Sequence, residues 1–400
     1  MLIDAQEAIR RLRVKPDTLY AYVSRGLIRA TPVPGSKEKR YYEVDIERLK
    51  RSRRKGRRTS IPPPSYDSFA PVLDTALCLI EDGHLYYRGV DAAELADNAS
   101  LEDVAALLWG TGNVPYVASE AGLPTWLATA IGTFVPTMSP IERAKSVLLV
   151  LAASDISAFD TTLPVVSRVG QRLMMAIAAS LTGKRPRGGP VHLQLAKDWR
   201  LGADGADLIR RCLVLSADHE LNPSTYVARC VASTGATPYA VVLAALCSFS
   251  GPRHGGHLLR VEDMLSDLIS SGSIKSSIND RWRRGERLLG FGHALYPDGD
   301  PRARELLDAL RHQFPKRMTA AIFEIAEAEL EKSGRAPIVD YAIAAIAIVL
   351  GLPRGSAQGL FLIGRSVGWI AHAVEQYAVQ TIIRPRARYV GPLPSIGGAK

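Results

Sequence analysis

Apolar residues at helical spacing predict two helices at the start of the chain, with a very short turn between them. The first helix carries Ala5, Ile9 and Leu12 on one face. The second starts at Pro16, because proline fits the first turn of a helix. Its inward side is predicted to consist of three apolar residues, Leu19, Val23 and Leu27.

The residues that follow predict a β-hairpin and a third helix. The hairpin covers residues 28–42 and turns at Pro34 and Gly35. The third helix covers residues 43–49, with Ile46 on its apolar side. The predicted order is therefore helix, turn, helix, hairpin, helix.

That order resembles the winged helix-turn-helix domain of the MerR and excisionase type. The segment Thr18–Leu27 resembles the recognition helix of that family and its exit. Because a recognition helix reads the major groove, double-stranded DNA is an expected partner of residues 1–58. The residues expected to face DNA are Asp17, Thr18, Tyr20, Ala21, Ser24 and Arg25.

The remainder of the chain, from about residue 67, has a helical pattern with few strand-like alternations. Apolar residues occupy most faces of several long segments, as expected for buried helices in a layered core. Examples are residues 100–110, 140–156, 205–217 and 238–249. A length of 400 residues with 47% hydrophobic composition allows a large core and more than one domain. We expect an all-α body, or nearly so.

Positive charge is concentrated at the start of the chain. The formal net charge is +10, and the first 60 residues contain 17 Lys and Arg against 7 Asp and Glu. A basic cluster at residues 51–58 precedes Pro62–Pro64, so we expect a basic and extended linker over residues 59–71. A basic head on a neutral body is typical of a module that meets a polyanion. A solvated basic tail or a protein-interaction module has the same composition.

Several classes of protein are disfavoured. The four cysteines lack a Cys-x-x-Cys spacing, which argues against a zinc site and a disulfide framework. The apolar run Tyr341–Leu352 is shorter than the roughly 18 residues of a membrane-spanning helix, and the first residues lack a signal-like apolar region. We therefore expect a soluble, cytoplasmic protein without a membrane or metal partner.

Candidate chemistry gathers in four short stretches, each with a protonatable side chain beside glycine, proline or a small polar residue. They are His219-Glu-Leu-Asn-Pro-Ser-Thr, Gly-Pro-Arg-His254-Gly-Gly, Gly-Phe-Gly-His293 running to Asp300-Pro-Arg302, and Ile-Val-Asp340-Tyr. Such settings are typical of loops and helix ends that present a side chain. Taken singly, Asp340 fits a helix cap, and each histidine fits a satisfied hydrogen-bonding group. Together the stretches supply an acid/base set.

In this order the stretches resemble the citrate synthase family, whose motifs read His-Glu-Leu-Asn-Ala-Ser-Thr, Gly-Pro-Leu-His-Gly-Gly, Gly-Phe-Gly-His with Asp-Pro-Arg, and Asn-Val-Asp-Phe. Residues 86–100 also resemble the N-terminal core motif of that family, and residues 363–372 and 384–386 resemble its C-terminal motifs. The likeness spans residues 72–390. It implies a citrate synthase fold with a large helical domain over residues 72–252 and 352–400, a small helical domain over residues 253–351, and the active site in the cleft.

The resemblance implies an acyltransferase of the tricarboxylic acid cycle that condenses acetyl-CoA with oxaloacetate. Asp340 would remove the methyl proton, His254 would donate to the enolate oxygen, and His293 would polarise the ketone, with His219 as its companion. Oxaloacetate would be bound by arginines, which offer carboxylates a forked donor: Arg302, Arg365 and Arg384. The family's last arginine comes from the neighbouring subunit, which implies a homodimer with shared active sites. Arg384 fits that position better than Arg386, because it heads the Arg-Pro-Arg motif. Coenzyme A enters as a substrate, and neither cofactor nor metal is implied.

The chain departs from the family pattern beside the acyl-CoA site. The family reads Ala-Asn-Glu after His-Gly-Gly, whereas this chain has His257-Leu258-Leu259, and we expect His257 to be a loop residue. Arg253 and Tyr341 are further changes nearby. Two alternatives therefore stay open: a 2-methylcitrate synthase that uses propionyl-CoA, and a DNA-binding regulator that senses metabolites through a citrate-synthase-like body.

Overall fold

The computed structural model divides into two compact units, Met1–Asp74 and Thr75–Lys400. Each unit has a hydrophobic core of its own. The residues that the structure describes are 2–24, 27–32, 38–43, 45–46, 50, 73–112, 138–185, 188–385, 387 and 390–391.

The N-terminal unit contains two helices and a small antiparallel sheet, with strand order β1-β3-β2. Its elements are β1 (Leu2–Ile3), α1 (Ala5–Leu12), α2 (Pro16–Ser24), β2 (Ala30–Pro32) and β3 (Lys39–Tyr42). Helix α1 begins where the carboxylate of Asp4 accepts the backbone N–H of Glu7 at 2.8 Å, a typical N-cap. The chain leaves α1 through Arg13 in the left-handed conformation, which makes the turn to α2 short.

The two helices at the start of the chain form where the hydrophobic pattern predicts them, but one core residue was predicted wrongly. Leu19 is buried and Val23 packs against the core, as expected. Leu27 is 42% exposed, whereas its neighbour Ile28 is 1% exposed. Because α2 ends at Ser24, helical spacing does not extend to Leu27. The predicted turn at Pro34 and Gly35 and most of the predicted third helix lie outside the described residues.

The larger unit starts with a three-stranded antiparallel sheet of β4 (Cys78–Glu81), β5 (His84–Tyr87) and β6 (Val90–Asp91). Helices make up nearly all of its other elements. They are α4 (Ala92–Asn98), α5 (Leu101–Trp109), α8 (Pro140–Ser154), the 3₁₀-helix η1 (Ile156–Phe159), α9 (Leu163–Thr182), α10 (Val191–Asp198), α11 (Ala203–Leu215), α12 (Pro223–Ala232), α13 (Pro238–Phe249), α14 (Gly256–Ser270), α15 (Ile274–Arg283), α16 (Pro301–Gln313), α17 (Arg317–Ser333), α18 (Val339–Val349) and α19 (Ser356–Val379).

The four long helices predicted from the apolar pattern are confirmed as α5, α8, α11 and α13. Two of them begin at capping boxes: Ser100 and Asp103 exchange hydrogen bonds at the start of α5, and Ser139 and Glu142 do so at the start of α8. Local capping therefore fixes where these helices begin, and burial of their apolar faces stabilises them.

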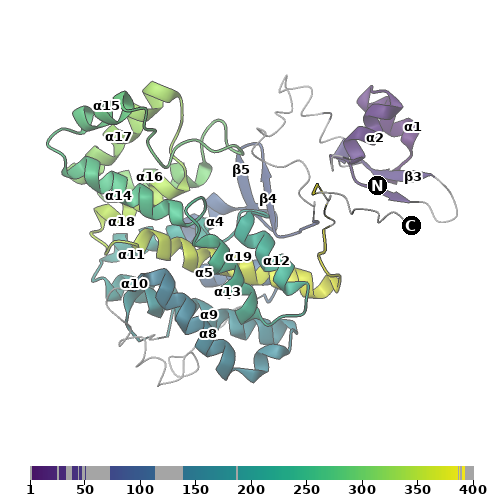
Figure 1. Ribbon diagram of the computed structural model, residues 1–400, viewed down its shortest axis with the longest axis horizontal. Helices are drawn as coiled ribbons and strands as arrows, with labels where there is room; N and C mark the ends of the chain where they lie inside the picture. Colours follow the sequence, from purple (N-terminus) through teal and green to yellow (C-terminus); the bar gives the residue numbers. More distant parts are fainter. Residues whose placement is uncertain are drawn as a thin grey trace, which may run out of the picture. The chain divides into compact units, whose positions relative to one another are not determined.

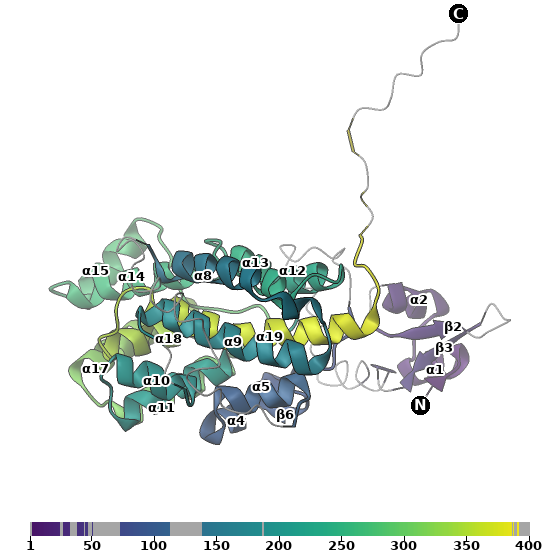
Figure 2. The ribbon, with the colours of Figure 1, turned by 90° about the horizontal axis from the view of Figure 1, so that it is seen from below.

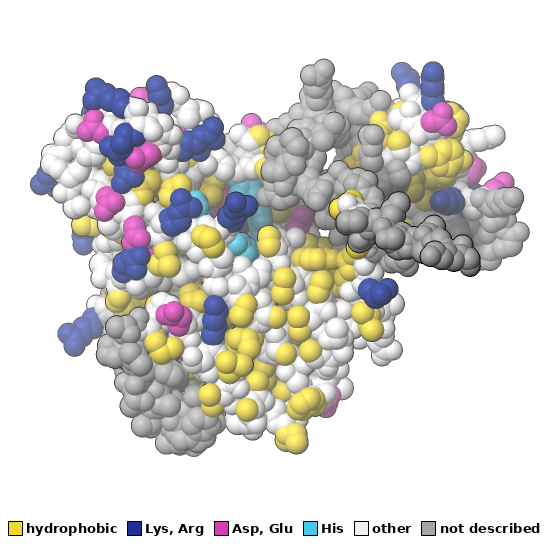
Figure 3. Space-filling model, viewed as in Figure 1, with side chains coloured by type: hydrophobic (Ala, Val, Ile, Leu, Met, Phe, Trp, Pro, Cys, Tyr) yellow, Lys and Arg dark blue, Asp and Glu magenta, His cyan; other side chains and the backbone are white. Residues whose placement is uncertain are grey.

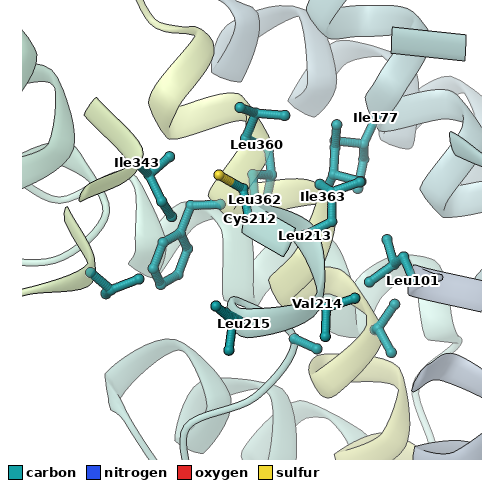
Figure 4. Close-up of a cluster of buried hydrophobic side chains, with 14 of the residues drawn as sticks. Leu101, Ile177, Cys212, Leu213, Val214, Leu215, Ile343, Leu360, Leu362 and Ile363 are labelled. Carbon is teal, nitrogen blue, oxygen red and sulfur yellow. The ribbon is translucent and has the colours of Figure 1, made fainter. Parts of the chain in front are cut away.

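Helix α19 runs through the centre of the larger unit, with α9 alongside it and other helices on both sides (Figures 1 and 2). Nearly every side chain of its first four turns is buried. Two glycines allow neighbouring backbone to approach: a Cβ on Gly364 would lie 2.4 Å from the carbonyl oxygen of Leu213, and one on Gly368 would lie 2.3 Å from that of Ala217. Figure 4 shows the resulting contact, in which residues 212–215 of α11 lie against apolar side chains of α19.

Helices α14 to α18 gather at one end of the larger unit (Figure 1) and contact one another. They meet the other helices through contacts of α14 and α18 with α19, and of α16 with α4 and α11. Within the described part of the chain, no helix combines the length and apolarity needed to span a bilayer.

Candidate functional site

The site is built where four helices begin. Ser224, His257, Arg302 and Asp340 are each the second residue of their helix, respectively α12, α14, α16 and α18. Three contacts link these helix starts: Ser224 to His254, His257 to Asp340, and the carboxylate of Asp300 to the backbone of α18. Because helix N-termini carry partial positive charge, such an arrangement favours anionic ligands.

Histidine side chains gather near the centre of one face of the larger unit, between helices α14–α18 and helices α12 and α13 (Figure 3). The chain brings them together from loops and helix starts that are distant in sequence. Of the seven sequence-predicted active-site residues, six lie in this region, and the seventh is Arg384.

His219, His293 and Tyr296 form an aromatic cluster in the deeper part of the site. The rings of His219 and His293 are 5.3 Å apart and nearly perpendicular, and Nε2 of His219 lies 2.9 Å from the hydroxyl of Tyr296. The backbone N–H of Leu295 donates to Nδ1 of His293 at 3.2 Å. That bond assigns the proton of a neutral His293 ring to Nε2, which can then donate to a ligand.

Both histidines are held neutral. Burial lowers the pKa of His219 well below its usual value, and the charges of Arg302 and Arg365 lower it further. Burial and Arg302 also lower the pKa of His293, against the opposing charges of Asp300 and Asp340. Neutral imidazoles can donate one hydrogen bond without adding charge to a buried site.

Arg302 is buried together with its carboxylate partner. Its Nε and Nη2 donate to Asp300 at 3.0 and 2.8 Å, and the second oxygen of Asp300 also accepts the backbone N–H of Val339 at 3.0 Å. Burial alone would raise the pKa of Asp300, but the charge and hydrogen bonds of Arg302 lower it overall. Asp300 therefore joins the starts of α16 and α18.

Arg365 projects from the middle of α19 and is almost fully buried. Its Nε donates to the carbonyl oxygen of Ser216 at 2.8 Å, and its guanidinium lies 4.8 Å from the ring centre of Phe361. Its Nη2 has no hydrogen-bond partner among the described residues. Burial and the nearby charge of Arg302 lower its pKa, with Asp218 opposing them. Two neighbouring buried guanidiniums thus create a site that favours a bound anion.

His254 lies in the turn before α14, and Ser224 holds its ring. Nε2 of His254 is 2.8 Å from the Ser224 hydroxyl, which also accepts the indole N–H of Trp369 at 3.2 Å. Burial and Arg365 lower the pKa of His254 to about 4, against the charge of Asp340. The ring is therefore neutral near pH 7, and Nδ1 is the nitrogen left for a ligand.

Asp340 does not cap its helix. The N-cap of α18 is Ile338, and Asp340 follows two residues later with a side chain that is 17% exposed. Its Oδ1 lies 3.2 Å from Nδ1 of His257, whose side chain is 24% exposed. A carboxylate that is neither the cap nor salt-bridged to arginine or lysine among the described residues is available as a base.

The glycines of the Gly290-Phe-Gly-His motif adopt positive φ angles of 87° and 77°, which favour glycine. A Cβ on Gly290 would lie 3.0 Å from Cβ of Tyr341, so this glycine lets the loop pack on α18. The contact that requires Gly290 is therefore one within the protein.

Arg384 is exposed in the segment after α19, where the backbone N–H of its neighbour Ile383 donates to the hydroxyl of Ser233 in the same unit at 3.1 Å. Arg386 lies outside the described residues. Of the candidate DNA-facing residues, Asp17 and Tyr20 are exposed on α2, and Thr18 and Ala21 are half-buried. The side chain of Ser24 and all of Arg25 lie outside the described residues.

Sequence reasoning did not assign roles to several residues that complete the site: Ser224, His257, Tyr296 and Asp300. Each lies within three residues of a predicted one or inside the same motif, which is the signal that was available. Among the described residues there is no group of three His, Cys, Asp or Glu side chains placed to hold a metal ion. The chemistry that this arrangement supports is acid/base catalysis beside two buried guanidiniums that favour an anion.

Comparison with known proteins identifies relatives of the larger unit. Residues 68–386 match the family model described as "Citrate synthase, C-terminal domain". Citrate synthase 2 of Bacillus subtilis is 28% identical over 351 residues, which cover 78% of this chain and 92% of that protein. 2-Methylcitrate synthase 1 of Corynebacterium glutamicum is 28% identical over 350 residues, which cover 78% of this chain and 90% of that protein.

A solved structure has the same fold. The crystal structure of citrate synthase from Thermotoga maritima superposes with a TM-score of 0.67 and 25% sequence identity. The match covers 82% of this chain and 95% of that one.

Proposed function

Because this chain belongs to the citrate synthase family and is an enzyme of that class, we propose that it condenses acetyl-CoA with oxaloacetate and water to give citrate and coenzyme A. The observation that carries the proposal is that Asp340 lies within electrostatic reach of His254, in a site that also holds the buried guanidiniums of Arg302 and Arg365. Enzymes of this class need no cofactor, and coenzyme A is part of the substrate.

In this proposal the thioester is activated by Asp340 and His254. Asp340 removes a proton from the methyl group next to the thioester carbonyl, and Nδ1–H of His254 donates to the developing enolate oxygen. For Nδ1 to carry the proton, the hydroxyl of Ser224 must donate to Nε2 of His254, and its hydrogen must therefore turn away from Oδ1 of Asn222, which is also 2.8 Å away. A neutral donor suits this step because its pKa of about 4 keeps the ring uncharged at neutral pH.

Oxaloacetate occupies the deeper part of the site. Its carboxylates pair with Arg302 and Arg365, and Nε2–H of His293 donates to its ketone oxygen, which makes the ketone carbon electrophilic. The enol carbon adds to that ketone carbon, and water then cleaves the thioester, which releases coenzyme A as a thiol. His219 completes the pocket through its contact with Tyr296.

The test is release of free thiol from acetyl-CoA, followed with a thiol-reactive dye, with and without oxaloacetate. The proposal predicts release that depends on oxaloacetate, with citrate as the product identified by mass spectrometry. A folded protein that releases no thiol with either acetyl-CoA or propionyl-CoA would refute it.

We propose that a further arginine of the oxaloacetate site, Arg384, comes from a partner subunit. Exposed apolar side chains of α8, η1 and the segment after α19 support a homodimer: Leu149, Ile156, Phe159 and Ile382. Mixing two inactive variants, Asp340→Asn and Arg384→Gln, tests the sharing. If Arg384 serves the partner's site, mixed dimers contain one intact site and regain activity. If it serves its own site, both sites of a mixed dimer stay defective.

The domain division also stays a proposal: residues 72–252 and 352–400 as the large domain, and 253–351 as the small one. The grouping of α14 to α18 supports it. So does the position of the site residues, which the two groups of helices share. The cytoplasmic location remains a prediction from the sequence.

A second candidate activity is 2-methylcitrate synthesis from propionyl-CoA. It is favoured by a 2-methylcitrate synthase among the relatives and by the departure of residues 257–259 from the family pattern, although Leu258 itself is buried in the hydrophobic core. Assays of acetyl-CoA and propionyl-CoA side by side decide between them, because the better substrate has the higher kcat/KM.

We further propose that the N-terminal unit binds DNA. Such binding would be compatible with a regulator that senses metabolites through the larger unit. Tyr20 is 56% exposed on α2, the proposed recognition helix, and Arg40 is exposed on β3. Part of the positive charge is already paired, since Glu7 bonds Arg10 and Arg11. Electrophoretic mobility shift of the full chain on duplex DNA should weaken steeply as salt rises. Binding that is unchanged after deletion of residues 1–60 would refute the proposal.

A further inference from the structure

We propose that His257 is a positioning residue for Asp340, which holds the carboxylate in the orientation needed for proton removal. The inference rests on the proposed condensation, because it gives a task to the side chain that contacts the base of that reaction. The sequence analysis treated His257 as a loop residue, whereas the structure places it in the first turn of α14 with its ring directed at the start of α18.

The contact between the two side chains defines their roles. Nδ1 of His257 lies 3.2 Å from Oδ1 of Asp340. An ionised carboxylate only accepts hydrogen bonds, so the proton lies on Nδ1 and the imidazole donates. This bond occupies Oδ1 and leaves Oδ2 as the oxygen that can take a proton from the substrate. Both side chains are half-buried, so water competes only partly for the contact.

The backbone around His257 is held firmly, so the ring is a fixed reference for the carboxylate. The backbone N–H of His257 donates to the carbonyl oxygen of His254 at 2.9 Å, and that of Gly256 donates to Gly251 at 3.0 Å. A Cβ on Gly255 would lie 2.2 Å from the ring of Phe249, which shows how closely the turn packs on α13. The turn cannot shift without disturbing that packing.

The spacing of three residues between His254 and His257 has a chemical consequence. One turn of chain presents the proposed donor to the enolate oxygen and the partner of the base. Burial lowers the pKa values of His254 and His293, and the charge of Asp340 opposes this lowering in both, so the carboxylate lies within electrostatic reach of both rings. Among the described residues, His257 is the imidazole that hydrogen-bonds to it.

Loss of the His257 contact would free the carboxylate to rotate about its Cβ–Cγ bond. A misplacement of about 1 Å in a reacting group can slow a reaction by about 10²-fold. Binding of oxaloacetate should not change, because the side-chain contact of His257 is with Asp340 and not with a residue proposed to bind oxaloacetate. The expected defect is therefore in kcat, with KM for oxaloacetate unchanged.

The experiment compares three substitutions of His257 in the full-length protein, with the thiol-release assay. His257→Ala removes the donor and should lower kcat roughly 10- to 100-fold. His257→Asn places an amide N–H at the same branch position as Nδ1 and should restore most of the activity. His257→Gln places its N–H one bond farther out and should not restore the activity. His312→Ala, which removes an exposed histidine from α16, is the matched control and should keep the wild-type kcat.

A second readout separates positioning from a loss of folded protein. With acetyl-CoA deuterated at the methyl group, proton removal should limit the rate more strongly in His257→Ala, so the isotope effect on kcat should increase. A merely structural role would lower kcat and leave the isotope effect as in the wild type. If His257→Ala does not fold, the comparison of kcat between His257→Asn and His257→Gln decides whether His257 positions the carboxylate.

The possible failures are distinguishable. A wild-type protein that releases no thiol refutes the proposed function, and this inference with it. An active wild type in which His257→Ala keeps its kcat within about twofold, or in which Asn and Gln are equally active, refutes the inference alone.

Discussion

The two halves of the site differ in how deeply their polar side chains are buried and how fully those side chains are paired. The half proposed for oxaloacetate is buried: Arg302 is paired with Asp300, Arg365 is hydrogen-bonded to backbone, and both histidines are held neutral. The half proposed for the thioester is half-exposed, and Asp340 and His257 lie at two helix starts. A small dianion needs fixed donors that are desolvated in advance, whereas a large thioester needs an open approach.

This difference suggests that the two halves fail in different ways. Changes in the buried half should cost stability or substrate affinity, because its charges compensate one another out of contact with water. Changes in the half-exposed half should cost turnover and leave the fold nearly unchanged. Four substitutions test that separation.

The largest effect is expected from Asp340→Asn. The amide has the shape of the carboxylate but cannot accept a proton, so kcat should fall roughly 10²- to 10⁴-fold in the thiol-release assay. Urea denaturation should show a free energy of unfolding close to that of the wild type, since Asp340 is not the cap of α18. A variant that keeps more than about a tenth of the wild-type kcat would contradict the assignment of the base.

Arg302→Gln should act mainly on stability. It leaves the carboxylate of Asp300 buried without its counterion, which typically costs about 3–5 kcal/mol in the free energy of unfolding. The double variant with Asp300→Asn removes both charges and should recover part of the loss. Denaturant titrations measure the free energy of unfolding of the single and the double variant. A destabilisation by Arg302→Gln below about 1 kcal/mol would show that the ion pair of Arg302 and Asp300 does not hold the starts of α16 and α18 together.

Arg365→Lys should act on substrate affinity. Lysine keeps the charge but lacks the planar fork, so a carboxylate loses one of two parallel hydrogen bonds. KM for oxaloacetate should rise roughly tenfold to a hundredfold, with KM for acetyl-CoA little changed. Steady-state kinetics with each substrate varied in turn provide the measurement. An equal rise in both KM values would argue against a role confined to the buried half.

The smallest effect is expected in the dependence of stability on pH. The pKa of His254 is lowered from 6.5 to about 4 in the folded state. Between these values the unfolded chain binds a proton that the folded chain does not, so stability falls as pH falls from about 6.5 to about 4. The contribution is on the order of 1 to 3 kcal/mol, and His254→Gln should flatten the slope accordingly.

His192→Gln is the comparison for this measurement. Burial also lowers the pKa of His192 to about 4, but His192 lies on α10, away from the site contacts. Its variant should flatten the pH dependence of stability and keep the thiol-release activity. If the unfolding free energies of His254→Gln and the wild type change in parallel over this range, the neutral state assigned to His254 is wrong.

The sequence predicted much of the fold because apolar spacing and capping act locally. Helices α5, α8, α11 and α13 formed where the pattern placed them. The exposed Leu27 shows the limit of spacing, since it continues a helical pattern past the end of α2. Gly26, directly before Leu27, was the available sign in the sequence that the helix ends, because glycine commonly follows the last turn of a helix.

The candidate site was predictable residue by residue but not as an assembly. The motifs indicated Asp340 and the histidines, and the structure brings six of the seven predicted residues together. What sequence could not show is that four helices begin at one place, because that depends on packing between helices far apart in the chain. The contact of His257 with Asp340 follows from that packing and joins residues 83 positions apart.

Titration of oxaloacetate into Asp340→Asn by calorimetry tests the separation of the two halves most directly. If the buried half is complete without the base, the variant binds oxaloacetate with a Kd within about threefold of the wild type while its kcat for thiol release falls at least about 10²-fold. Loss of oxaloacetate binding in a folded Asp340→Asn protein would contradict the account, because the two halves would then be one site that depends on the carboxylate.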